Sequence, residues 1–509
     1  MLSIGDIATF CKRKGFVYPS SEVYGGLSGF FDYGPLGVEL FNNLKQHWWK
    51  FFVRDREDMV GIEASVISHP RIWKASGHVD SFTDVLVRCS KCKTTFRADH
   101  LVEEKAKVKV EGLSVEELGN LIIQHKLSCP NCKGAFEPLQ KFNLLFVTNV
   151  GPSQGSANTA YIRGETAQGM FTDFKLIVET ARQKIPFGIA QVGRCFRNEI
   201  APRDFLFRSR EFTIGEFEFF IHPNEERCPL ETKQSFELPI QLLDRASQAA
   251  GKDQAAGTTI GKMVQGKKLS EWHGYWLGQQ LLWLQSLGIS PAHLRVREHV
   301  QTELSHYSSA TFDIEYLYPF GWKEFAGNAD RGQFDLTQHM KESKEKLEIF
   351  DEASKSKIIP RVIEPTFGMD RVFLALLAEG YHDDQKRGNI VLQLLPKLAP
   401  FAVGVFPLVN KVEEEAKTVF GLLKNEFSCF FDTSGSIGRR YARADEIGIP
   451  FCVTIDFDTL KDGSVTIRNR DSTKQIRVER KALVSVIHTL IGGGEFSHCG
   501  KEVGKSQSF

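Results

Sequence analysis

The sequence has no long hydrophobic run. No apolar stretch approaches the roughly 18 residues that a membrane-spanning helix needs, so we expect no membrane span. The N-terminal sequence MLSIGDIATFCKRKGF has polar breaks and no extended apolar core, which predicts no secretory signal. We therefore expect a cytoplasmic protein whose cysteines stay reduced or bind a metal instead of forming disulfides.

The sequence also has almost no net charge. Its 64 lysines and arginines nearly balance its 63 aspartates and glutamates, which leaves a formal net charge of +1. Because the whole chain has no strong field to steer a polyanion, any contact with nucleic acid must come from local basic patches. A length of 509 residues predicts roughly two to four domains, and the 42% of hydrophobic residues is ordinary for a globular protein.

Two short cysteine motifs have identical spacing. Cys89-x-x-Cys92 and Cys129-x-x-Cys132 can each form a tight turn, and together they can give four thiolates to a tetrahedral zinc ion. The motifs are about 36 residues apart, longer than the usual 15 to 20, so a helical insert at residues 115–126 would loop out. Four thiolates leave no position for water, which predicts a structural zinc site; four unrelated cysteines are the alternative.

Charged residues gather in the stretch 193–220, GRCFRNEIAPRDFLFRSREFTIGEFEFF. Alternation of apolar and polar residues from Phe212 predicts two antiparallel strands joined by a long loop. The alternation slips by one residue near Glu216, which indicates a bulge or a turn there. Buried charges are costly unless paired or liganded. The charged residues of this stretch form either structural ion pairs or a surface that binds a polyphosphate and an ammonium group. They are Arg197, Arg203, Arg208, Arg210, Glu199, Glu211, Glu216 and Glu218.

Several strings together resemble one enzyme family. FRNE at 196–199, followed by FRSREF at 207–212, resembles motif 2 of the class II aminoacyl-tRNA synthetases, in the form found in dimeric glycyl-tRNA synthetases. YIRGETAQGMF at 161–171 is similar to the glycine-recognition segment of that family, and IEPTFGMDRVFLALL at 363–377 to its motif 3. The region 20–70 resembles motif 1, and the resemblance can be followed along the whole chain.

The resemblance implies a fold, an activity and partners. The fold is an α+β catalytic domain built on an antiparallel sheet, with a C-terminal α/β anticodon-binding domain. The activity is that of a glycine–tRNA ligase: glycine and ATP form glycyl-adenylate, and the glycyl group passes to the 3′ end of tRNA(Gly). Motif 1 implies a homodimer. The expected domains are the N-terminal part with motif 1 at 1–88, a zinc-ribbon-like insertion at 89–140, the core with motif 2 at 141–220, an insertion domain at 221–305, the core with motif 3 at 306–398 and the anticodon-binding domain at 399–509.

The resemblance also assigns the ATP site. Arg197 would bind the α-phosphate, and Arg208 and Arg371 the outer phosphates. Phe212 and Arg371 would sandwich the adenine. A lone carboxylate in a phosphate site is best explained as a Mg²⁺ ligand, and this role falls to Glu324. The catalytic set is Arg197, Glu199, Arg208 and Arg371, and ATP binding adds Asn198, Phe207, Ser209, Arg210, Glu211, Phe212, Glu324, Phe325, Gly368, Met369 and Asp370.

Glycine recognition is assigned in the same way. Glu165 and Glu216 would hold the ammonium group, and Thr366 would close the wall so that alanine is excluded by a clash. Glu165 and Thr166 could instead cap a helix over 167–182. The sequence departs from the family at Gly164, usually proline, and at Thr366, usually serine. The glycine set is Arg97, Glu165, Phe212, Thr213, Ile214, Gly215, Glu216, Glu364, Pro365, Thr366, Phe367 and Gly368.

The C-terminal region offers an RNA contact. Arg439, Arg440 and Arg443 lie near a predicted helix start, where cations are disfavoured unless a phosphate binds; a solvated surface is the alternative. Two other functions are the alternatives: a synthetase for serine, threonine or proline, and a non-catalytic RNA-binding protein with the same fold. The carboxylate-rich pocket argues against the first, and the retained cationic and acidic residues of motifs 2 and 3 argue against the second.

Overall fold

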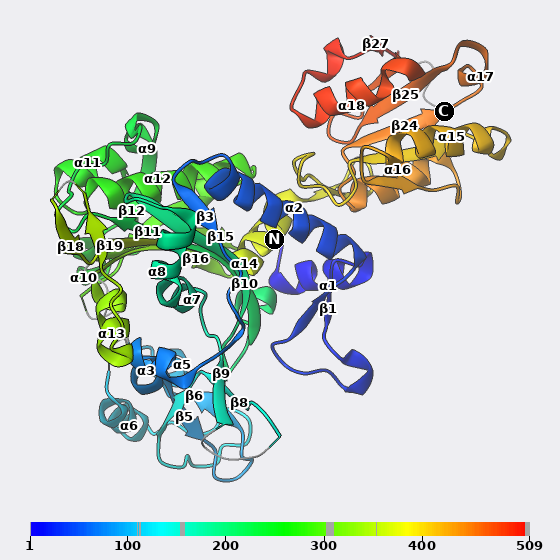
Figure 1. Ribbon diagram of the computed structural model, residues 1–509. Helices are drawn as coiled ribbons and strands as arrows, with labels where there is room; N and C mark the ends of the chain where they lie inside the picture. Colours follow the sequence, from blue (N-terminus) through cyan, green and yellow to red (C-terminus); the bar gives the residue numbers. More distant parts are fainter. Residues whose placement is uncertain are drawn as a thin grey trace.

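The computed structural model describes residues 2–108, 110, 113–152, 158–301, 310–352 and 354–503. These residues form a large unit around a central sheet, a small cysteine-rich unit and a C-terminal α/β unit (Figure 1). Residues 302–305 of the predicted insertion lie outside the described part. Among the described helices, none is both long and apolar enough to cross a membrane.

Nine strands form the central sheet, in the order β13-β12-β14-β15-β16-β19-β11-β10-β3. Neighbours are antiparallel except for β12 with β14 and β10 with β3, which are parallel. The middle strands β16, β19 and β11 pair with one another in sequence, which brings segments far apart in the chain side by side. The bounds are β3 Met59–Gly61, β10 Phe187–Phe196, β11 Glu211–Ile221, β12 Pro239–Leu243, β13 Ala256–Thr259, β14 Leu294–Glu298, β15 Ala310–Tyr318, β16 Gly321–Gly332 and β19 Arg361–Gly368.

The segment 221–301 is part of this sheet and not a separate insertion domain, which corrects the prediction for 221–305. Strand β14 pairs with β15 in an unbroken register from Leu294↔Tyr316 to Glu298↔Phe312, and β12 and β13 extend the sheet beyond it. Helix α12 (Glu271–Ser286), predicted over 271–287, packs its buried tryptophans into the main core. Shorter helices α9 (Lys233–Glu237), α10 (Arg245–Ala249) and α11 (Ile260–Gln265) lie around it.

One face of the sheet packs against α2 (Pro35–Trp49), α12 and α14 (Met369–Gly380). Helix α2 begins at Pro35 after Gly34, as predicted, and its buried Leu36, Leu40, Leu44 and Trp48 recur every four residues. The chain continues as a π-helix over Lys50–Arg54. The N-terminal helix α1 (Ile4–Lys14) and the hairpin of β1 (Val17–Pro19) and β2 (Phe31–Tyr33) pack against this layer.

The other face packs against α7 (Ala167–Thr172), α8 (Phe174–Ala181) and α13 (Phe334–Ser343). A single helix was predicted over 167–182, but it ends at Thr172 and restarts at Phe174. The rings of Phe171, Phe174, Phe187 and Phe220 form the core between these helices and the sheet.

Strand β11 has no bulge near Glu216, so that prediction is wrong. Its register with β10 is continuous from Phe187↔Phe220 to Phe196↔Glu211. Phe217 and Phe219 point into the α2/α12 core, while Phe220 points into the α7/α8 core, so both faces of the strand are covered. A strand buried on both faces does not alternate between apolar and polar residues. The apparent slip arises because Glu216 and Glu218 share the face of Phe220.

The cysteine-rich unit joins three strands, β6-β5-β7, with helices α5 and α6. Helix α6 (Val115–Gln124) confirms the insert predicted at 115–126. Pro70 begins helix α3 (Pro70–Ala75), two residues after a short strand ends. The other bounds are β5 Thr83–Arg88, β6 Thr95–Arg97, α5 Ala98–Ala106, β7 Gln140–Asn143, α4 His78–Ser81 and, in a separate small sheet, β4 Ile67–Ser68, β8 Phe146–Asn149 and β9 Thr159–Ile162.

The C-terminal unit is a six-stranded sheet in the order β23-β22-β24-β25-β26-β27. The first three strands are parallel and the rest antiparallel. Helices α15 and α18 share one core with the sheet, and α16 packs into another. The bounds are β22 Val403–Pro407, α15 Glu413–Lys424, β23 Cys429–Phe431, α16 Ile437–Glu446, β24 Phe451–Ile455, α17 Thr459–Asp462, β25 Ser464–Asn469, β26 Gln475–Glu479, α18 Leu483–Ile491 and β27 Lys501–Glu502.

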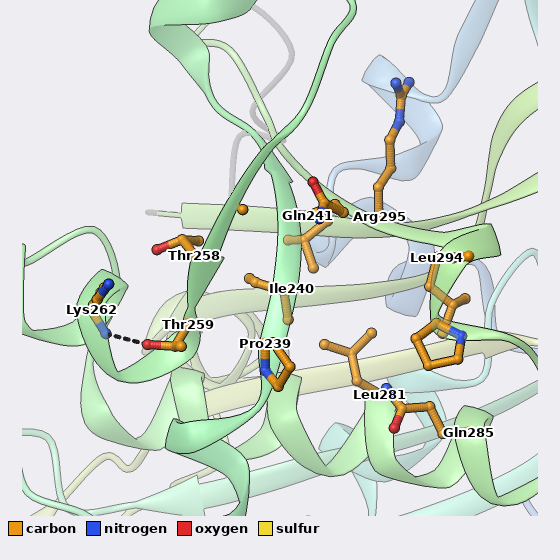
Figure 2. A pocket seen from close by; sticks show the side chains of 14 residues that line it. Pro239, Ile240, Gln241, Thr258, Thr259, Lys262, Leu281, Gln285, Leu294 and Arg295 are labelled. Atoms are coloured by element: carbon orange, nitrogen blue, oxygen red, sulfur yellow. Dashed lines mark hydrogen bonds between the residues drawn. The ribbon is translucent and has the colours of Figure 1, made fainter.

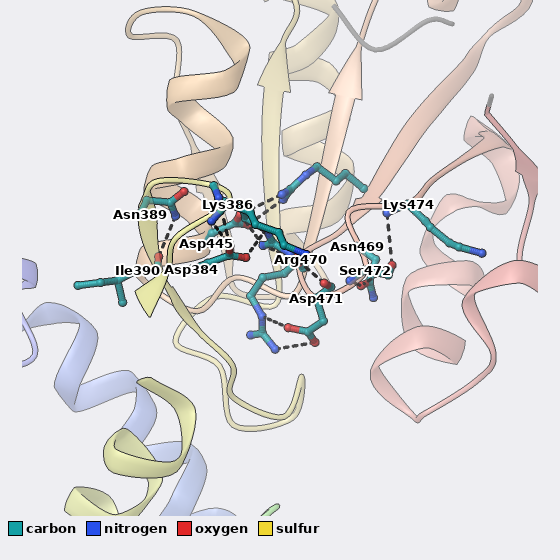
Figure 3. A network of polar contacts seen from close by, with 12 residues as sticks. Asp384, Lys386, Asn389, Ile390, Asp445, Asn469, Arg470, Asp471, Ser472 and Lys474 are labelled. Atoms are coloured by element: carbon teal, nitrogen blue, oxygen red, sulfur yellow. Dashed lines mark hydrogen bonds and ion pairs between the residues drawn. The ribbon is translucent and has the colours of Figure 1, made fainter. Parts of the chain in front are cut away.

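A hairpin connects the two large units. It consists of β20 (Tyr381–Asp384) and β21 (Asn389–Leu392), and Arg387 lies in its turn. The Arg387 guanidinium donates to Asp445 of α16 at 3.2 Å and to the carbonyl of Arg470 at 2.8 Å. Figure 3 shows Asp445 and Arg470 within this polar network. Asp445 is almost fully buried and also accepts two hydrogen bonds from Arg468, at 2.7 and 2.9 Å. The joint is therefore a polar network that fixes α16 against the hairpin.

We expect Arg387→Ala to loosen this joint. The variant loses charged hydrogen bonds that are worth roughly 1.5 to 3 kcal/mol each when formed to ionised groups. Hydrogen exchange measured by mass spectrometry should rise in β20, β21 and α16 and stay unchanged in the central sheet. Lys386→Ala is the matched control, because within the described part of the chain Lys386 forms a hydrogen bond through its backbone N–H, which the substitution keeps. Equal exchange in both variants would show that the network does not hold the units together.

Candidate active site

Residues from motifs 2 and 3 meet in one cleft at the end of β11. Its walls come from the loop between β10 and β11, from β11, from β16 and from the start of α14. The cleft is lined by Arg197, Glu199, Leu206, Phe207, Arg208, Ser209, Phe212, Thr213, Ile214, Glu324, Phe325, Ala326, Gly327, Thr366, Gly368, Asp370 and Arg371. Strand pairing across about 170 residues therefore assembles most of the predicted ATP site.

Arg197 follows β10 directly and is held at the cleft by its ring contacts. Its guanidinium carbon lies 5.1 Å from the ring centre of Phe82 and 5.3 Å from that of Phe212. Its Nε donates to the carbonyl of Gly164 at 3.1 Å. Among the described residues, its two terminal nitrogens have no protein hydrogen bond, so the fork can bind two oxygens of a phosphate.

Arg208 and Glu199 form an ion pair inside the cleft. Arg208 Nε donates to Glu199 Oε2 at 2.7 Å, and its Nη2 lies 3.7 Å from Asp84 Oδ2. Asp84 Oδ2 in turn forms an ion pair with Arg97 Nη1 at 2.8 Å. Arg97 also pairs with Asp99. Arg97 was predicted to bind glycine, but it does not line the cleft and reaches it only through Asp84 and Arg208.

Arg371, in the first turn of α14, reaches across the cleft. Its Nε donates to the carbonyl of Phe207 at 3.0 Å, and its Nη1 donates to the carbonyl of Glu324 at 2.9 Å and to Glu324 Oε2 at 3.3 Å. Its guanidinium lies 4.3 Å from the ring centre of Phe207. A Cβ on Gly368 would lie 3.2 Å from Arg371 Cδ, so a side chain at position 368 would crowd this path.

Asp370 is tied to the protein. Its carboxylate accepts from Thr213 N at 2.5 Å and from Tyr33 Oη at 2.6 Å, and this links α14 to β11 and β2. Burial raises the pKa of Asp370, although these two hydrogen bonds oppose the increase. We therefore assign Asp370 to holding the helix that carries Arg371.

Several predicted ligands point elsewhere. The ring of Phe367 packs against Trp48, Phe52 and Trp283 on the far face of the sheet, because alternation along β19 sends it away from Thr366 and Glu364. Met369 is likewise buried in that core, whereas Phe325 belongs to that core and also lines the cleft. Three more predicted ligands lie outside the cleft lining. Arg210 donates to the carbonyls of Glu199 and Ser28, and Glu211 pairs with Arg194. The backbone N–H of Asn198 donates to the carbonyl of Leu144.

A carboxylate cluster lies farther along the same face of β11. Oxygens of Glu216, Glu218 and Glu364 all lie within 4.8 Å of one another, and all three residues are buried. Glu216 accepts hydrogen bonds from Thr166 Oγ1 at 2.5 Å and from Thr366 Oγ1 at 2.8 Å. Thr366, which also lines the cleft, therefore joins the cleft to this cluster. Thr166 makes no cap hydrogen bond, so the alternative of a helix cap is wrong for its hydroxyl.

Glu364 is held by a buried arginine. Arg331, 1% exposed, donates to Glu364 at 2.7 Å and makes two hydrogen bonds to Asp335, at 2.7 and 2.8 Å. Burial raises the pKa of Glu364 well above its usual value, and Arg331 opposes part of that increase. The cluster thus has more carboxylates than nearby cations, which makes it suited to a cationic ligand.

Glu165 lies next to this cluster, and its neighbours lower its pKa. Its carboxylate lies 3.1 Å from His78 Nε2 and accepts from Gln168 at 2.8 Å. Burial alone would raise the pKa of Glu165, but His78, Arg331 and the hydrogen bond from Gln168 lower it well below its usual value. Gln168 also donates to Asp335, so Glu165 and the Arg331 network are connected.

The four predicted zinc ligands come together. All four Sγ atoms lie within 4.8 Å of one another, with Cys89–Cys132 at 3.5 Å and Cys92–Cys129 at 3.6 Å. The two turns have the same form: Lys93 N donates to the carbonyl of Cys89, Lys133 N donates to that of Cys129, and both lysines have a φ of +60°. Four thiolates from two matched turns fit a tetrahedral Zn²⁺.

The predicted RNA contact of the C-terminal unit is corrected at Arg440. Its guanidinium is buried and donates to the carbonyls of Pro407, Leu408 and Gly435. It shares the inward face of α16 with Ala444, so helical spacing turns it away from solvent. Arg443 pairs with Asp432 at 2.6 Å, and Arg439 is exposed.

A larger hollow lies between β12, β13, β14, α11 and α12 (Figure 2). It measures about 480 Å³, and in the figure the Arg295 side chain extends away from the apolar walls. Arg295 is already bound by Glu315 at 2.5 Å and by Asp253 at 3.0 Å. None of the predicted site residues lines this hollow, so size alone does not make it the active site.

Sequence reasoning missed several residues that shape the site. His78, Gln168, Asp84 and Asp335 hold predicted residues in place, and their roles depend on contacts between segments far apart in the chain. Glu218 had a local signal, because it lies two residues from Glu216 on one strand and so shares its face.

Comparison with known proteins agrees with this geometry. Residues 402–490 match the family model described as "Anticodon binding domain". The chain is 44% identical over 488 residues to the glycine–tRNA ligase of Acetivibrio thermocellus, covering 94% of this chain and 96% of that one. It is 43% identical over 487 residues to that of Caldanaerobacter subterraneus, with the same coverage.

Both likenesses cover almost the whole of this chain and of each relative. On these grounds the chain belongs to the glycine–tRNA ligase family.

Proposed function

We propose that this chain activates glycine with ATP and transfers the glycyl group to tRNA. One observation carries the proposal: a single strand, β11, runs from a cleft lined by arginines to a buried cluster of carboxylates. The first can bind the triphosphate of ATP and the second the ammonium group of glycine, so that the glycine carboxylate can face the α-phosphorus that it attacks.

In this proposal the central sheet is the catalytic domain of a class II synthetase. The carboxylate of glycine attacks the α-phosphorus of ATP, and pyrophosphate leaves. Arg197 holds the α-phosphate, while Arg208 and Arg371 hold the outer phosphates. No side-chain nucleophile is needed, so the protein acts by positioning and by neutralising charge.

A divalent cation fits the outer edge of the cleft. Mg²⁺ is usually held by one or two carboxylates together with the phosphates of its nucleotide. The Glu324 side chain is 49% exposed at the cleft, and its protein partner is Arg371. Glu324 would hold Mg²⁺, which would neutralise phosphate charge.

The amino-acid substrate is tested by charging unfractionated tRNA with each amino acid in turn. We expect charging with glycine alone. Charging with serine, threonine or proline would support a different synthetase, and no ATP consumption with any amino acid would support a non-catalytic RNA-binding protein.

Glu216→Gln should weaken glycine binding. The substitution keeps the shape but removes the charge that two threonine hydroxyls stabilise. A charge-assisted hydrogen bond is worth roughly 1.5 to 3 kcal/mol, so we expect KM for glycine to rise about tenfold to hundredfold while KM for ATP changes little. Pyrophosphate exchange at varied glycine and ATP measures both. An unchanged KM for glycine would place the ammonium group elsewhere.

We propose that the four cysteines hold a structural Zn²⁺. The ion would fix β5 and β6, and β5 carries Asp84, the partner of Arg97 and Arg208. The zinc site therefore supports one wall of the cleft without entering the chemistry.

The purified chain should contain one zinc ion, and Cys92→Ser combined with Cys132→Ser should remove it. Metal analysis by mass spectrometry measures the content. Cys228→Ser is the control, because this buried cysteine lies outside the cluster and should leave the zinc content unchanged. Full zinc content in the double variant would exclude this ligand set.

The homodimer and the tRNA contact of the C-terminal unit stay predictions. The homodimer rests on the motif 1 resemblance of residues 20–70. The contact of the C-terminal unit with tRNA now rests on Arg439 and Arg443, since Arg440 is buried.

A further inference from the structure

Glu218 is the one member of the carboxylate cluster that no donor stabilises. Its side chain is fully buried, and neither oxygen has a hydrogen-bond partner among the described residues. The register of β11 with β19 pairs Glu216 with Thr366 and Phe219 with Ile363, which puts Glu218 opposite Glu364. Two carboxylates directly opposite on neighbouring strands repel each other when both are ionised.

The donors around the cluster are shared unequally. Glu216 accepts from two hydroxyl groups, and Glu364 accepts from Arg331. Hydrogen bonds to the ionised form of a carboxyl group favour that form, and among the described residues Glu218 has no such donor. Burial, together with the charge of Glu364, raises the pKa of Glu218 well above its usual value.

The surrounding elements add little positive charge. Glu216 lies on the same strand, Glu364 on β19, Arg331 on β16 and Asp335 on α13. On the β10 side the residue opposite Glu218 is the apolar Ile189. From the α7 side come the neutral Gln168 and the pair of Glu165 with His78. Arg331 is already bound by Asp335 and Glu364, so it does not neutralise a third carboxylate.

We propose that Glu218 holds a proton in the unliganded pocket and releases it to the solvent when the ammonium group of glycine binds beside Glu216. The inference rests on the proposed position of the glycine pocket. A cation within roughly 4 to 6 Å favours the ionised form of a carboxyl group, so the ammonium takes the place of the proton as the counter-charge. Glu218 is thus a positioning residue that sets the charge of the pocket.

Release of a proton makes glycine binding depend on pH. By linkage, a ligand that expels a proton binds more tightly as the proton concentration falls. Between about pH 6 and 7.5, where an unperturbed α-amino group remains largely charged, Kd for glycine should fall by up to roughly tenfold per pH unit.

Isothermal titration calorimetry of the full chain with glycine tests the proposal. Titrations at one pH in two buffers with different heats of ionisation give the number of protons released. We expect the wild-type chain to release up to one proton. Glu218→Gln keeps the shape of a neutral carboxyl group and should release none, with a Kd that no longer changes with pH. Glu218→Leu, which removes both oxygens, serves as a second variant in case the glutamine variant folds poorly. It should also release no proton.

The possible outcomes separate this inference from the proposed function. If the wild-type chain releases no proton, or if Glu218→Gln releases as many as the wild type, Glu218 does not carry the proton and the inference is overturned. If Glu216→Gln leaves glycine affinity unchanged, the position of the pocket itself is wrong. Weaker binding in Glu216→Gln, combined with loss of proton release in Glu218→Gln, supports both.

Discussion

Arg197→Ala should lower the rate of glycine-dependent pyrophosphate exchange by about a hundredfold to a thousandfold, the usual effect of removing one preorganised donor from a developing charge. The reason is geometric. Arg208 and Arg371 each bind protein groups in the cleft, whereas Arg197 keeps both terminal nitrogens available while two rings and the Gly164 carbonyl fix its direction. The loss should appear in kcat more than in KM for glycine, since the interaction serves the phosphate in the transition state.

Two further variants sharpen this test. Arg197→Lys restores the charge but not the planar fork, so we expect it to recover less than about a tenth of the lost rate. Arg203→Ala is the matched control: Arg203 lies in the same loop, its side chain is 52% exposed, and it lies 3.6 Å from Asp204. A surface pair of this kind contributes little, so activity should stay within about twofold of the wild type. Retention of wild-type exchange by Arg197→Ala would remove Arg197 from the phosphate site.

Arg331→Met should destabilise the central unit by roughly 3 to 5 kcal/mol, because it leaves the buried carboxylates of Asp335 and Glu364 without their cation. All seven tryptophans precede residue 323, so urea unfolding followed by tryptophan fluorescence reports on this unit and not on the C-terminal one. Since Arg331 is 1% exposed and makes three hydrogen bonds to these two carboxylates, little solvent screening weakens the effect.

The control for Arg331 is an exposed ion pair on the same helix layer. Arg71 pairs with Glu342 of α13 at 2.9 Å, and its side chain is 55% exposed, so Arg71→Met should cost no more than about 1 kcal/mol. Adding Glu364→Gln to Arg331→Met should restore part of the loss, because one unpaired charge is then removed. Equal unfolding midpoints for the Arg331 and Arg71 variants would contradict the argument.

Features with a local pattern could be predicted from the sequence. The four-residue spacing of Leu36, Leu40, Leu44 and Trp48 fixes one buried face of α2, and each CxxC motif determines its own turn. The strand pair around motif 2 was predicted from a partial alternation, although β11 is covered on both faces, and the resemblance to a family supplied the roles of the arginines.

Features that depend on distant partners could not be predicted. The order of nine strands, which absorbs 221–301 into the central sheet, is set by packing between segments and not by any local string. The position of Thr166 predicts a helix cap, but its hydroxyl instead donates to Glu216, which lies fifty positions later in the chain. The position of Arg440 near a helix start predicts a phosphate ligand, but Arg440 lies on the face of α16 that is buried.

The joint at Arg387 has a consequence for the size of the RNA. Because this arginine ties the β20–β21 turn to α16, the C-terminal unit has a set distance and direction from the cleft before any RNA binds. A tRNA that reaches both places must span that distance with its own length. Deleting base pairs from the arm between the anticodon and the 3′ end would therefore shift the terminal adenosine away from the adenylate, even when every nucleotide that the protein contacts is kept.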